Sequence, residues 1–377
     1  MSKGKVGIIS RHAISNYGSL LQAYALESVI AKNEYSALTI HYVPKCEKGI
    51  RLALSMADNQ RQKYHGIKRV VFLLYQFPSV IILNYRFNKY RTKWLHMTKE
   101  CNDEKELRDN CQKFDILCTG SDQVWNRISN GQLDPCYFLS FYSPRQRCIS
   151  YAASFGGKEI LEGNKETLKG LLNKYETITV REKNGLEVLK AIQCDGENVL
   201  DPTLLIEKKD WESKCKIEKR KKPYILIYQL KRNQEFDRIV NEIAKDKSCD
   251  IIRVSTMFFQ VFKAGKYFFA PPPENVLGLI RNAKLVITDS FHATVFSLVF
   301  NTPFLEVLPG RFNARNLSLL EMTDLRDRIV NYDNFRSVIQ SAIDWDNVNN
   351  IISNQRARSY QKLISMLKGK KECESNE

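Results

Sequence analysis

The stretch KVGIISRHAISNYGSLLQAYALESVIAKNEYSALTIHYV, residues 5–43, decides the fold. Residues 5–10 and 36–43 are rich in β-branched and apolar side chains, a composition typical of buried strands. Between them, apolar side chains recur at the spacing of one helical face. This strand–helix–strand order predicts the start of a doubly wound α/β fold with a parallel sheet.

The same alternation continues along the chain in two sets. The strand-like runs lie at 114–120, 146–156, 177–182 and 197–203 in the first set, and at 223–230, 249–255, 283–290 and 302–308 in the second. Between the sets, the charged stretch KCKIEKRKK (214–222) is typical of a linker. We therefore expect a Rossmann-like N-terminal domain over 1–213, a second Rossmann-like domain over 223–345, and a C-terminal helix over 346–377 that returns to the first domain.

Composition excludes several classes of protein. The chain of 377 residues is 43% hydrophobic, enough for two cores, yet no run approaches the roughly 20 apolar residues of a membrane-spanning helix. The N-terminus lacks the features of a signal peptide, so we expect a cytoplasmic protein. Ten scattered cysteines without a CxxC pair predict reduced thiols rather than disulfides. No histidine lies in ligand spacing with a cysteine, so we expect no metal site.

A basic insert in the first domain, residues 45–99, holds most of the net charge of the chain, which is +16. The insert has twelve Lys and Arg residues against Glu47 and Asp58, a local charge of +10. Within it, residues 67–94 interleave cations with aromatic and aliphatic side chains, and Pro78 interrupts the apolar run.

Two interpretations of this basic insert are open. One is peripheral contact with anionic lipid headgroups, which would place the protein at the inner face of a membrane. The other is a helical hairpin packed on the first domain with its basic face in water. No known nucleic-acid-binding motif accompanies the charge, so we expect no nucleic-acid partner.

The run TDSFHATVFSLVF (288–300) places a lone histidine in an apolar segment. It continues from a predicted strand, so Ser290 is suited to cap a helix and His292 to lie in its first turn. His292 would then lie at the carboxyl edge of the sheet, where open α/β folds bind ligands. There the helix dipole disfavours an imidazolium and favours an anion, which suits a neutral imidazole to proton transfer near pH 7. The alternative is a histidine that only caps and packs.

A second candidate site lies in FDILCTGSDQVWN, residues 114–126. Gly120 permits a tight turn after the strand, which would place Ser121 and Asp122 at its carboxyl end. A carboxylate there accepts hydrogen bonds from sugar hydroxyls or assists proton transfer, with Ser121 as a further substrate contact. An ordinary Asx turn or helix cap is the alternative interpretation.

Three further places could bind an anionic group. Asn16 and Gly18 lie at the first strand-to-helix turn, where backbone amides can cradle an anion, although no GxGxxG or P-loop pattern is present. Arg181 follows a strand and could clamp a carboxylate or phosphate, or form a surface ion pair. Arg311 and Arg315 lie in a polar stretch after the last strand and could bind an anion or be solvated.

Six segments occur in a recognisable order: NYGSLLQAYAL, FDILCTGSDQVWN, YAASFG, TVREKNG, VLDPTLL and TDSFHATVFSLVF. Together they resemble the polysaccharide pyruvyl transferase family, from about Lys5 to Ile329. The resemblance implies a fold similar to glycosyltransferase-B, in which two Rossmann-like domains face a cleft. It also implies that phosphoenolpyruvate is the donor substrate, without a cofactor, and that its pyruvyl unit joins a sugar diol as a cyclic ketal while phosphate leaves. The implied setting is capsule or exopolysaccharide biosynthesis, and we expect the glycan acceptor to be lipid-linked.

Residue by residue, the resemblance places the family's essential histidine at His292 and its substrate-binding arginine at Arg181. The family's basic residue beyond the histidine helix has Arg311 and Arg315 as candidates here. The residue types suit this chemistry, because phosphoenolpyruvate carries a carboxylate and a phosphate. We expect His292 to act as general acid and base, and Asp122 to orient or deprotonate the acceptor hydroxyl.

Two other functions fit the same scaffold. A glycosyltransferase that uses a nucleotide sugar would bind a nucleoside diphosphate tightly. A non-catalytic relative that only binds polysaccharide would release no phosphate from phosphoenolpyruvate with any acceptor.

Overall fold

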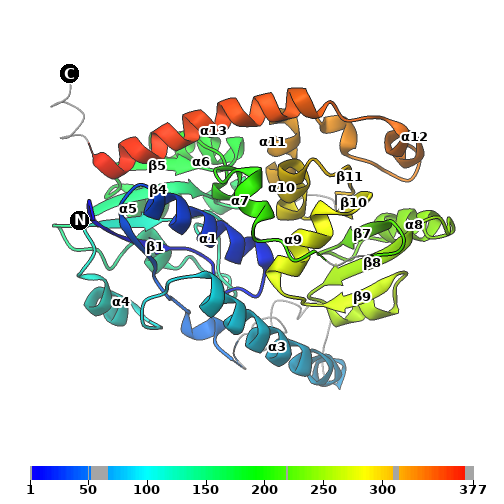
Figure 1. The fold of residues 1–377 in the computed structure, drawn as a ribbon. Helices are drawn as coiled ribbons and strands as arrows, with labels where there is room; N and C mark the ends of the chain where they lie inside the picture. Colours follow the sequence, from blue (N-terminus) through cyan, green and yellow to red (C-terminus); the bar gives the residue numbers. More distant parts are fainter. Residues whose placement is uncertain (1, 50, 52–66, 218–219, 309–313, 370–377) are drawn as a thin grey trace. The chain divides into compact units, whose positions relative to one another are not determined.

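The computed structural model describes residues 2–49, 51, 67–217, 220–308 and 314–369, with the backbone alone for 67–78. The chain forms two compact units: unit 1 comprises Met1–Leu205 and Ala357–Glu377, and unit 2 comprises Ile206–Arg356. Each unit has one sheet flanked by helices (Figure 1). These two parallel α/β sheets confirm the predicted pair of Rossmann-like domains.

The sheet of unit 1 has the strand order β2-β1-β3-β4-β5-β6, and every pairing in it is parallel. Its strands are β1 (Lys5–Ile9), β2 (Ser36–Thr39), β3 (Ile116–Thr119), β4 (Arg147–Ala153), β5 (Thr177–Val180) and β6 (Glu197–Asn198). The central strands are buried almost throughout, which explains their continuous apolar sequences. Ile9 lies opposite Thr119, so the residues that follow β1 and β3 meet at one edge.

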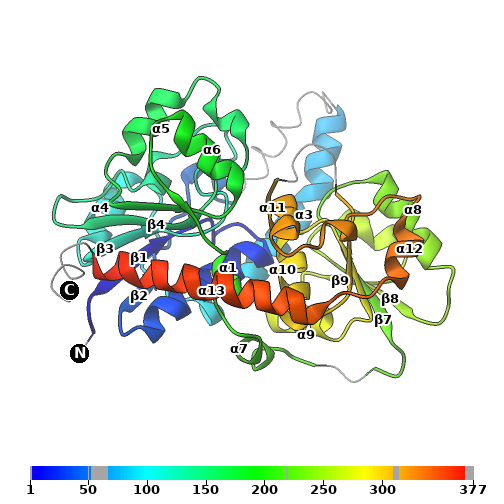
Figure 2. The same ribbon diagram turned by 90° about the horizontal axis from the view of Figure 1, so that it is seen from above.

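The helices of unit 1 cover both faces of this sheet. They are α1 (Tyr17–Lys32), α3 (Ile67–Trp94), α4 (Glu104–Cys111), α5 (Lys165–Leu172), α6 (Lys183–Ala191) and the part of α13 (Trp345–Lys368) from Ala357 onward. Figure 2 shows α5 and α6 on one face and α1 with the C-terminal half of α13 on the other. Trp125 packs on Phe138 and Phe155, with ring centroids 5.8 Å and 4.9 Å away, in the core of the unit.

The sheet of unit 2 has the order β11-β10-β7-β8-β9, again all parallel. Its strands are β7 (Tyr224–Tyr228), β8 (Asp250–Ser255), β9 (Lys266–Phe269), β10 (Leu285–Thr288) and β11 (Phe304–Glu306). Its helices are α7 (Lys208–Glu212), α8 (Gln234–Ile243), α9 (Pro273–Arg281), α10 (Phe291–Phe300), α11 (Ala314–Met322), α12 (Phe335–Gln340) and the start of α13. The short 3₁₀ helices of the two units are Lys45–Glu47, Pro135–Phe138, Lys158–Leu161, Pro202–Leu204, Phe258–Phe262 and Arg326–Arg328. The edge strand β9 was not among the predicted strands, because it is short and only partly buried.

The boundary of unit 1 lies at Leu205 rather than at the predicted residue 213. The helix α7 belongs to unit 2, because Trp211 packs edge-on against Phe296 with ring centroids 5.0 Å apart. In addition, Arg281 donates from Nε to Glu212 over 3.1 Å. Residues 206–213 follow β6 closely in the chain, so the sequence pattern assigned them to the first domain. Their apolar and ionic partners, Phe296 and Arg281, lie later in the chain.

The C-terminal residues complete unit 1. The Leu200 amide donates to Ser359 Oγ over 3.0 Å. Arg147 donates to the carbonyls of Met366 and Leu367 over 2.7 Å and 2.8 Å, at the end of α13. Unit 1 is therefore built from two separate stretches of the chain.

Candidate active site

Polar side chains of unit 1 gather where its parallel strands end. We call the following residues the unit 1 cluster: Ser19, Ser121, Asp122, Arg181, Glu182 and Asp201; all of them are buried. Most follow directly from strands β3 and β5, and Ser19 comes from the first turn of α1. The structure thus brings together the predicted Ser121, Asp122 and Arg181 at one edge of the sheet.

Arg181 lies among carboxylates at the centre of the unit 1 cluster. Its Nη1 donates to Asp201 over 3.0 Å, and its Nε donates to Glu182 over 3.4 Å. Nη2 lies 3.9 Å from Asp122 Oδ1. Burial would lower the pKa of Arg181, but the three carboxylates outweigh it and raise that pKa. The pairs are buried rather than on the surface, so an incoming anion would have to compete with internal carboxylates.

Asp122 has an uncommon backbone conformation. Its φ is +80°, the left-handed region that few non-glycine residues adopt, and such conformations concentrate at functional sites. The turn is held because the Val124 and Ser154 amides donate to the Asp122 carbonyl over 2.7 Å and 3.0 Å. The carboxylate accepts a hydrogen bond from Ser19 Oγ, and its side chain keeps 12% exposure. The sequence analysis did not identify Ser19. Its position in the first turn of α1, after a predicted strand, could have indicated a role at the site.

Asn16 is the N-cap of α1. Its Oδ1 accepts a hydrogen bond from the Gly18 amide over 2.7 Å. An anion that used the Gly18 amide would therefore have to displace this cap.

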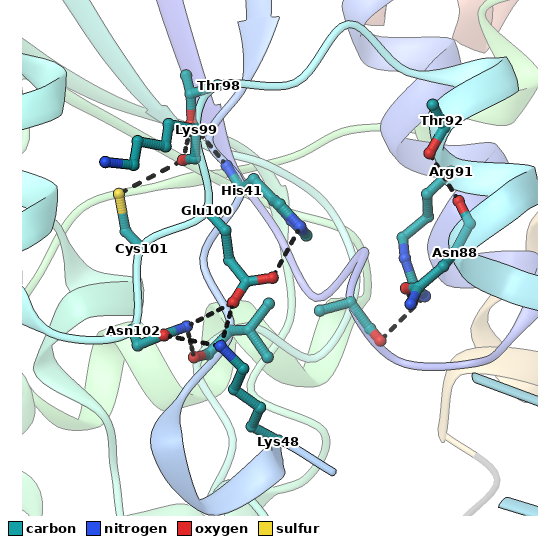
Figure 3. A network of polar contacts seen from close by, with 12 residues as sticks. His41, Lys48, Asn88, Arg91, Thr92, Thr98, Lys99, Glu100, Cys101 and Asn102 are labelled. Carbon is teal, nitrogen blue, oxygen red and sulfur yellow. Dashed lines mark hydrogen bonds and ion pairs between the residues drawn. The ribbon is translucent and has the colours of Figure 1, made fainter. Parts of the chain in front are cut away.

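The loop between β1 and α1 is held from outside by the basic insert. Arg91 of α3 donates to the carbonyl of Ala13 over 3.1 Å, and Figure 3 shows its guanidinium beside Asn88 of the same helix. On the other side of the loop, His12 Nε2 lies 3.1 Å from His41 Nδ1, and His41 is joined in turn to Glu100 (Figure 3). Burial lowers the pKa of His12 to about 3, so His12 is neutral at physiological pH. Arg91 of the insert and His41, which lies before the insert, thus hold the loop that leads to Asn16.

In unit 2, His292 lies in the first turn of α10 and is half-buried. Ser290 is the N-cap, and its Oγ accepts a hydrogen bond from the Ala293 amide over 3.4 Å, which confirms the predicted cap. The Phe291 ring stands edge-on to the imidazole, with centroids 5.1 Å apart. The predicted strand–Ser–x–His–helix arrangement is therefore present at the carboxyl end of β10.

Asp289 joins the carboxyl ends of β10 and β7. Its carboxylate accepts hydrogen bonds from the amides of Leu230 and Lys231 over 2.6 Å and 2.8 Å. Burial raises the pKa of Asp289 to about 6, against the opposing effect of these amides. Lys231, which sequence reasoning missed, lies directly after a predicted strand, and that position was its signal.

Arg315 lies in the first turn of α11 and next to the turn that carries His292. Its Cζ is 5.9 Å from the centroid of the Phe291 ring. Burial, and then the charge of Arg315, lower the pKa of Lys231. The other predicted arginine, Arg311, lies outside the described residues.

Glu306 ends β11 as a fully buried carboxyl group. Burial raises its pKa to about 8, so it carries a proton at neutral pH. The hydrogen bonds agree, because Thr294 Oγ1 lies 3.1 Å from the Ser290 carbonyl and also contacts Glu306. A hydroxyl has one hydrogen, so both contacts are satisfied when Glu306 donates to Thr294. Sequence reasoning missed Glu306, which looks like an ordinary residue at the end of a strand.

Several other features were searched over the described part of the chain. No group of three or more His, Cys, Asp or Glu side chains there could hold a metal ion. Each cysteine within the described ranges is a free thiol. None of the described helices is long and apolar enough to cross a membrane.

Comparisons with known proteins identify a family and a fold. The family model described as polysaccharide pyruvyl transferase matches residues 16–308. No curated protein matches the sequence. Among solved structures, a putative UDP-N-acetylglucosamine 2-epimerase from Listeria monocytogenes is 11% identical with a TM-score of 0.53, over 98% of this chain and 96% of that one.

Two further solved structures share the fold. The UDP-GlcNAc 2-epimerase from Neisseria meningitidis, bound to UDP-GlcNAc, is 10% identical with a TM-score of 0.53, over 96% of this chain and 99% of that one. The spinosyn rhamnosyltransferase SpnG is 9% identical with a TM-score of 0.50, over 97% and 100% of the two chains. At these identities the similarity shows the fold alone.

Proposed function

Because the chain belongs to the polysaccharide pyruvyl transferase family, we propose that it moves the pyruvyl unit of phosphoenolpyruvate onto a sugar diol as a cyclic ketal. The proposed setting is capsule or exopolysaccharide biosynthesis in the cytoplasm. The observation that carries the proposal is the family match over residues 16–308, which includes His292 at the start of α10. A positioned imidazole at a strand end is suited to the proton transfers that this reaction needs.

The reaction balances through two proton movements. One acceptor hydroxyl attacks the carbon that bears the phosphate ester, and a proton adds to the methylene carbon, which becomes a methyl group. The second hydroxyl then closes the ring on the same carbon, and the carbon–oxygen bond to phosphate breaks. The proton of this second hydroxyl leaves with phosphate. We assign His292 to these transfers as general acid and base. The pyruvyl unit as a whole keeps its oxidation level, because the carbon that gains a C–O bond is balanced by the methylene carbon that gains a hydrogen, so the exchange requires no redox cofactor.

For unit 1, we propose that Asp122 orients or deprotonates an acceptor hydroxyl. Its carboxylate keeps some exposure while Ser19 and Arg181 hold it in place. Ser121, which follows β3, and Asn16, the N-cap of α1, are proposed as further substrate contacts. Arg181 then acts on the substrate through Asp122, unless a donor anion displaces one of its carboxylates.

A nucleotide-sugar glycosyltransferase is the second candidate, because the fold is shared with a rhamnosyltransferase and with UDP-GlcNAc epimerases. Thermal unfolding with phosphoenolpyruvate, UDP, GDP or phosphate separates the two. A ligand at 100 times its Kd stabilises the native state by about 2.7 kcal/mol. We expect phosphoenolpyruvate to raise the Tm and the nucleotides to leave it unchanged. A rise with UDP or GDP alone would support the glycosyltransferase instead.

The helix α3 has two distinct faces. One face packs on α1, with the Phe87 ring 5.0 Å from Tyr17 and the Trp94 ring 4.9 Å from Tyr24. The other face exposes Tyr85 at 74%, together with the side chains of Ile81, Ile82, Lys89 and Lys93. We propose that this exposed face contacts anionic headgroups, where a lipid-linked glycan acceptor would be held.

Co-sedimentation with vesicles tests the docking proposal. Wild-type protein should pellet with vesicles of phosphatidylserine and phosphatidylcholine but not with phosphatidylcholine alone. The double substitution Lys89→Glu and Lys93→Glu should weaken that binding by at least about tenfold, since each cation near such a surface contributes about 1 kcal/mol. The exposed Lys247→Glu in unit 2 is the matched control and should bind as wild type does. Equal pelleting with both kinds of vesicle would contradict electrostatic docking.

A further inference from the structure

The connection between β8 and β9 exposes apolar side chains from a short 3₁₀ helix. This helix, Phe258–Phe262, lies near the edge of the unit 2 sheet, where β9 is the last strand (Figure 1). Side chains three residues apart share one face of a 3₁₀ helix, as Phe258 and Val261 do. We call the following exposed side chains the unit 2 patch: Met257, Phe258, Val261 and Phe262. Phe262 is the most exposed of them, at 86%.

The burial of this segment is the reverse of what its residue types favour. The polar Gln260 is fully buried, while the apolar side chains on both sides of it face water. Gln260 Nε2 donates to the Gln229 carbonyl over 2.7 Å, and its Oε1 accepts a hydrogen bond from Arg253 over 3.3 Å. A hydrogen-bonded glutamine therefore holds the apolar side chains outward.

Further contacts fix the two ends of the 3₁₀ helix. After its last turn, Lys263 Nζ donates to Asp237 Oδ1 over 2.6 Å. Before its first turn, the carbonyl of Met257 accepts a hydrogen bond from the Tyr267 hydroxyl over 3.0 Å. The backbone of the patch is thus already ordered, so a partner can bind it without an entropy cost for folding a loop.

Cations surround the unit 2 patch. The Arg232 guanidinium lies over the Phe259 ring at 4.2 Å, and Lys263 lies 5.3 Å from the same centroid. The charge of Lys263 is offset by its pair with Asp237, whereas Lys266 adds an exposed cation at the start of β9. No acidic residue occurs between β8 and β9. The surface therefore combines exposed apolar side chains with positive charge.

This combination indicates the kind of partner. Adjacent exposed apolar side chains, unlike scattered ones, mark interaction sites. Lysine is depleted in interfaces between proteins, whereas segments that lie in a membrane interface combine phenylalanine with lysine and arginine. We propose that the unit 2 patch inserts into the surface of an anionic lipid bilayer. Phe262 enters the boundary between headgroups and acyl chains, and the neighbouring cations contact the headgroups.

The position of the patch in the sheet gives this contact a consequence. Strands β8 and β10 both run parallel to β7, so the patch follows the same edge of the sheet as the turn that carries His292. Membrane contact would bring this edge of unit 2 toward the lipid surface. Under the proposed function a lipid-linked acceptor would be presented there. The contact itself depends neither on that reaction nor on α3, which lies in the other unit.

Co-sedimentation of the full-length protein with vesicles of phosphatidylserine and phosphatidylcholine tests the proposal. Phe262→Ser should weaken binding by about tenfold or more, because it removes a large apolar side chain from the acyl boundary without a change in charge. Ile339→Ser is the matched control, since Ile339 is an exposed residue of α12, which contacts β11 at the opposite edge of the sheet. The control should bind as wild type does, and thermal unfolding should show that both variants are folded.

A tryptophan placed in the patch reports insertion directly. In Phe262→Trp, vesicles should shift the tryptophan fluorescence to shorter wavelength, and brominated phosphatidylcholine should quench it more strongly than it quenches the wild type. Both proteins contain the four native tryptophans, so the difference reports position 262. Unchanged binding of Phe262→Ser, an equal loss in Ile339→Ser, or no additional quenching in Phe262→Trp would each overturn the proposal.

Another occupant of the patch would give a different result. If Phe262→Ser converted a dimer to a monomer in analytical ultracentrifugation while vesicle binding stayed as in the wild type, the patch would join two copies of the chain and the proposal would be wrong. The vesicles contain neither phosphoenolpyruvate nor a glycan, so their binding does not depend on pyruvyl transfer. Failure of the proposed function would be seen separately, because no acceptor would then cause phosphate release from phosphoenolpyruvate.

Discussion

Replacement of His292 by alanine should lower the turnover of phosphoenolpyruvate by about 10²–10⁴-fold, the usual contribution of a positioned general acid or base. The imidazole is half-buried in the first turn of α10, and the cap that begins this helix belongs to Ser290. The helix should therefore form without the imidazole. Release of phosphate at saturating donor concentration measures the effect, and thermal unfolding confirms that the variant is folded.

A control substitution at a second histidine tests whether the loss of turnover is specific to His292. His96, which pairs with Glu27 in unit 1, can be replaced by alanine and should leave turnover within about twofold of wild type. Free imidazole added to the His292→Ala protein should restore part of the rate if a proton transfer was lost. Retention of more than about a tenth of wild-type turnover would exclude the acid–base role.

Replacement of Arg181 by methionine should lower the free energy of unfolding by about 3–5 kcal/mol, because it leaves buried carboxylates without their cation. Asp201 and Glu182 are nearly inaccessible to water and both contact this guanidinium. Urea unfolding measures the change. Arg145→Met, at an exposed arginine that donates to the Gln112 carbonyl, is the control and should stay within about 0.5 kcal/mol.

Replacing one of the carboxylates that contact Arg181 distinguishes a structural role of this arginine from a role in substrate binding. If the guanidinium acts mainly within the cluster, Asp201→Asn should recover part of the stability lost in Arg181→Met, as a double-mutant cycle would show. If instead Arg181→Met unfolds like the wild type but no longer binds phosphoenolpyruvate, Arg181 is a direct substrate ligand. In that case its carboxylates serve only to orient it.

The order of strands and helices could be predicted from local sequence, because buried strands and helical faces have distinct periods. The Ser290 cap before His292 was predictable for the same reason, since the signal lies within a few residues. The carboxylates around Arg181 could not be predicted. Asp201 and Asp122 approach Arg181 only because parallel strands end at one edge, which depends on strand order and not on spacing in the chain.

Lys231 and Glu306 show a different limit of sequence reasoning. Lys231 directly follows a predicted strand and Glu306 lies within another, but so do many residues without a role. The protonation of Glu306 follows from its complete burial and from its position beside the Thr294 hydroxyl, which also contacts the Ser290 carbonyl. Neither the burial nor these contacts can be read from the sequence. The boundary at Leu205 was not predicted for a related reason, because Trp211 packs on Phe296, which lies 85 residues later in the chain.

The two-part construction of unit 1 has a consequence for how the protein is made. Synthesis delivers domains in order from the N-terminus, and each can fold once its residues have emerged. Here residues 206–356 leave the ribosome before the segment that supplies Ser359 and the last turn of α13 to unit 1. Unit 2 can therefore complete itself first, while the earlier-synthesised unit still lacks the contacts that α13 makes with Leu200 and Arg147.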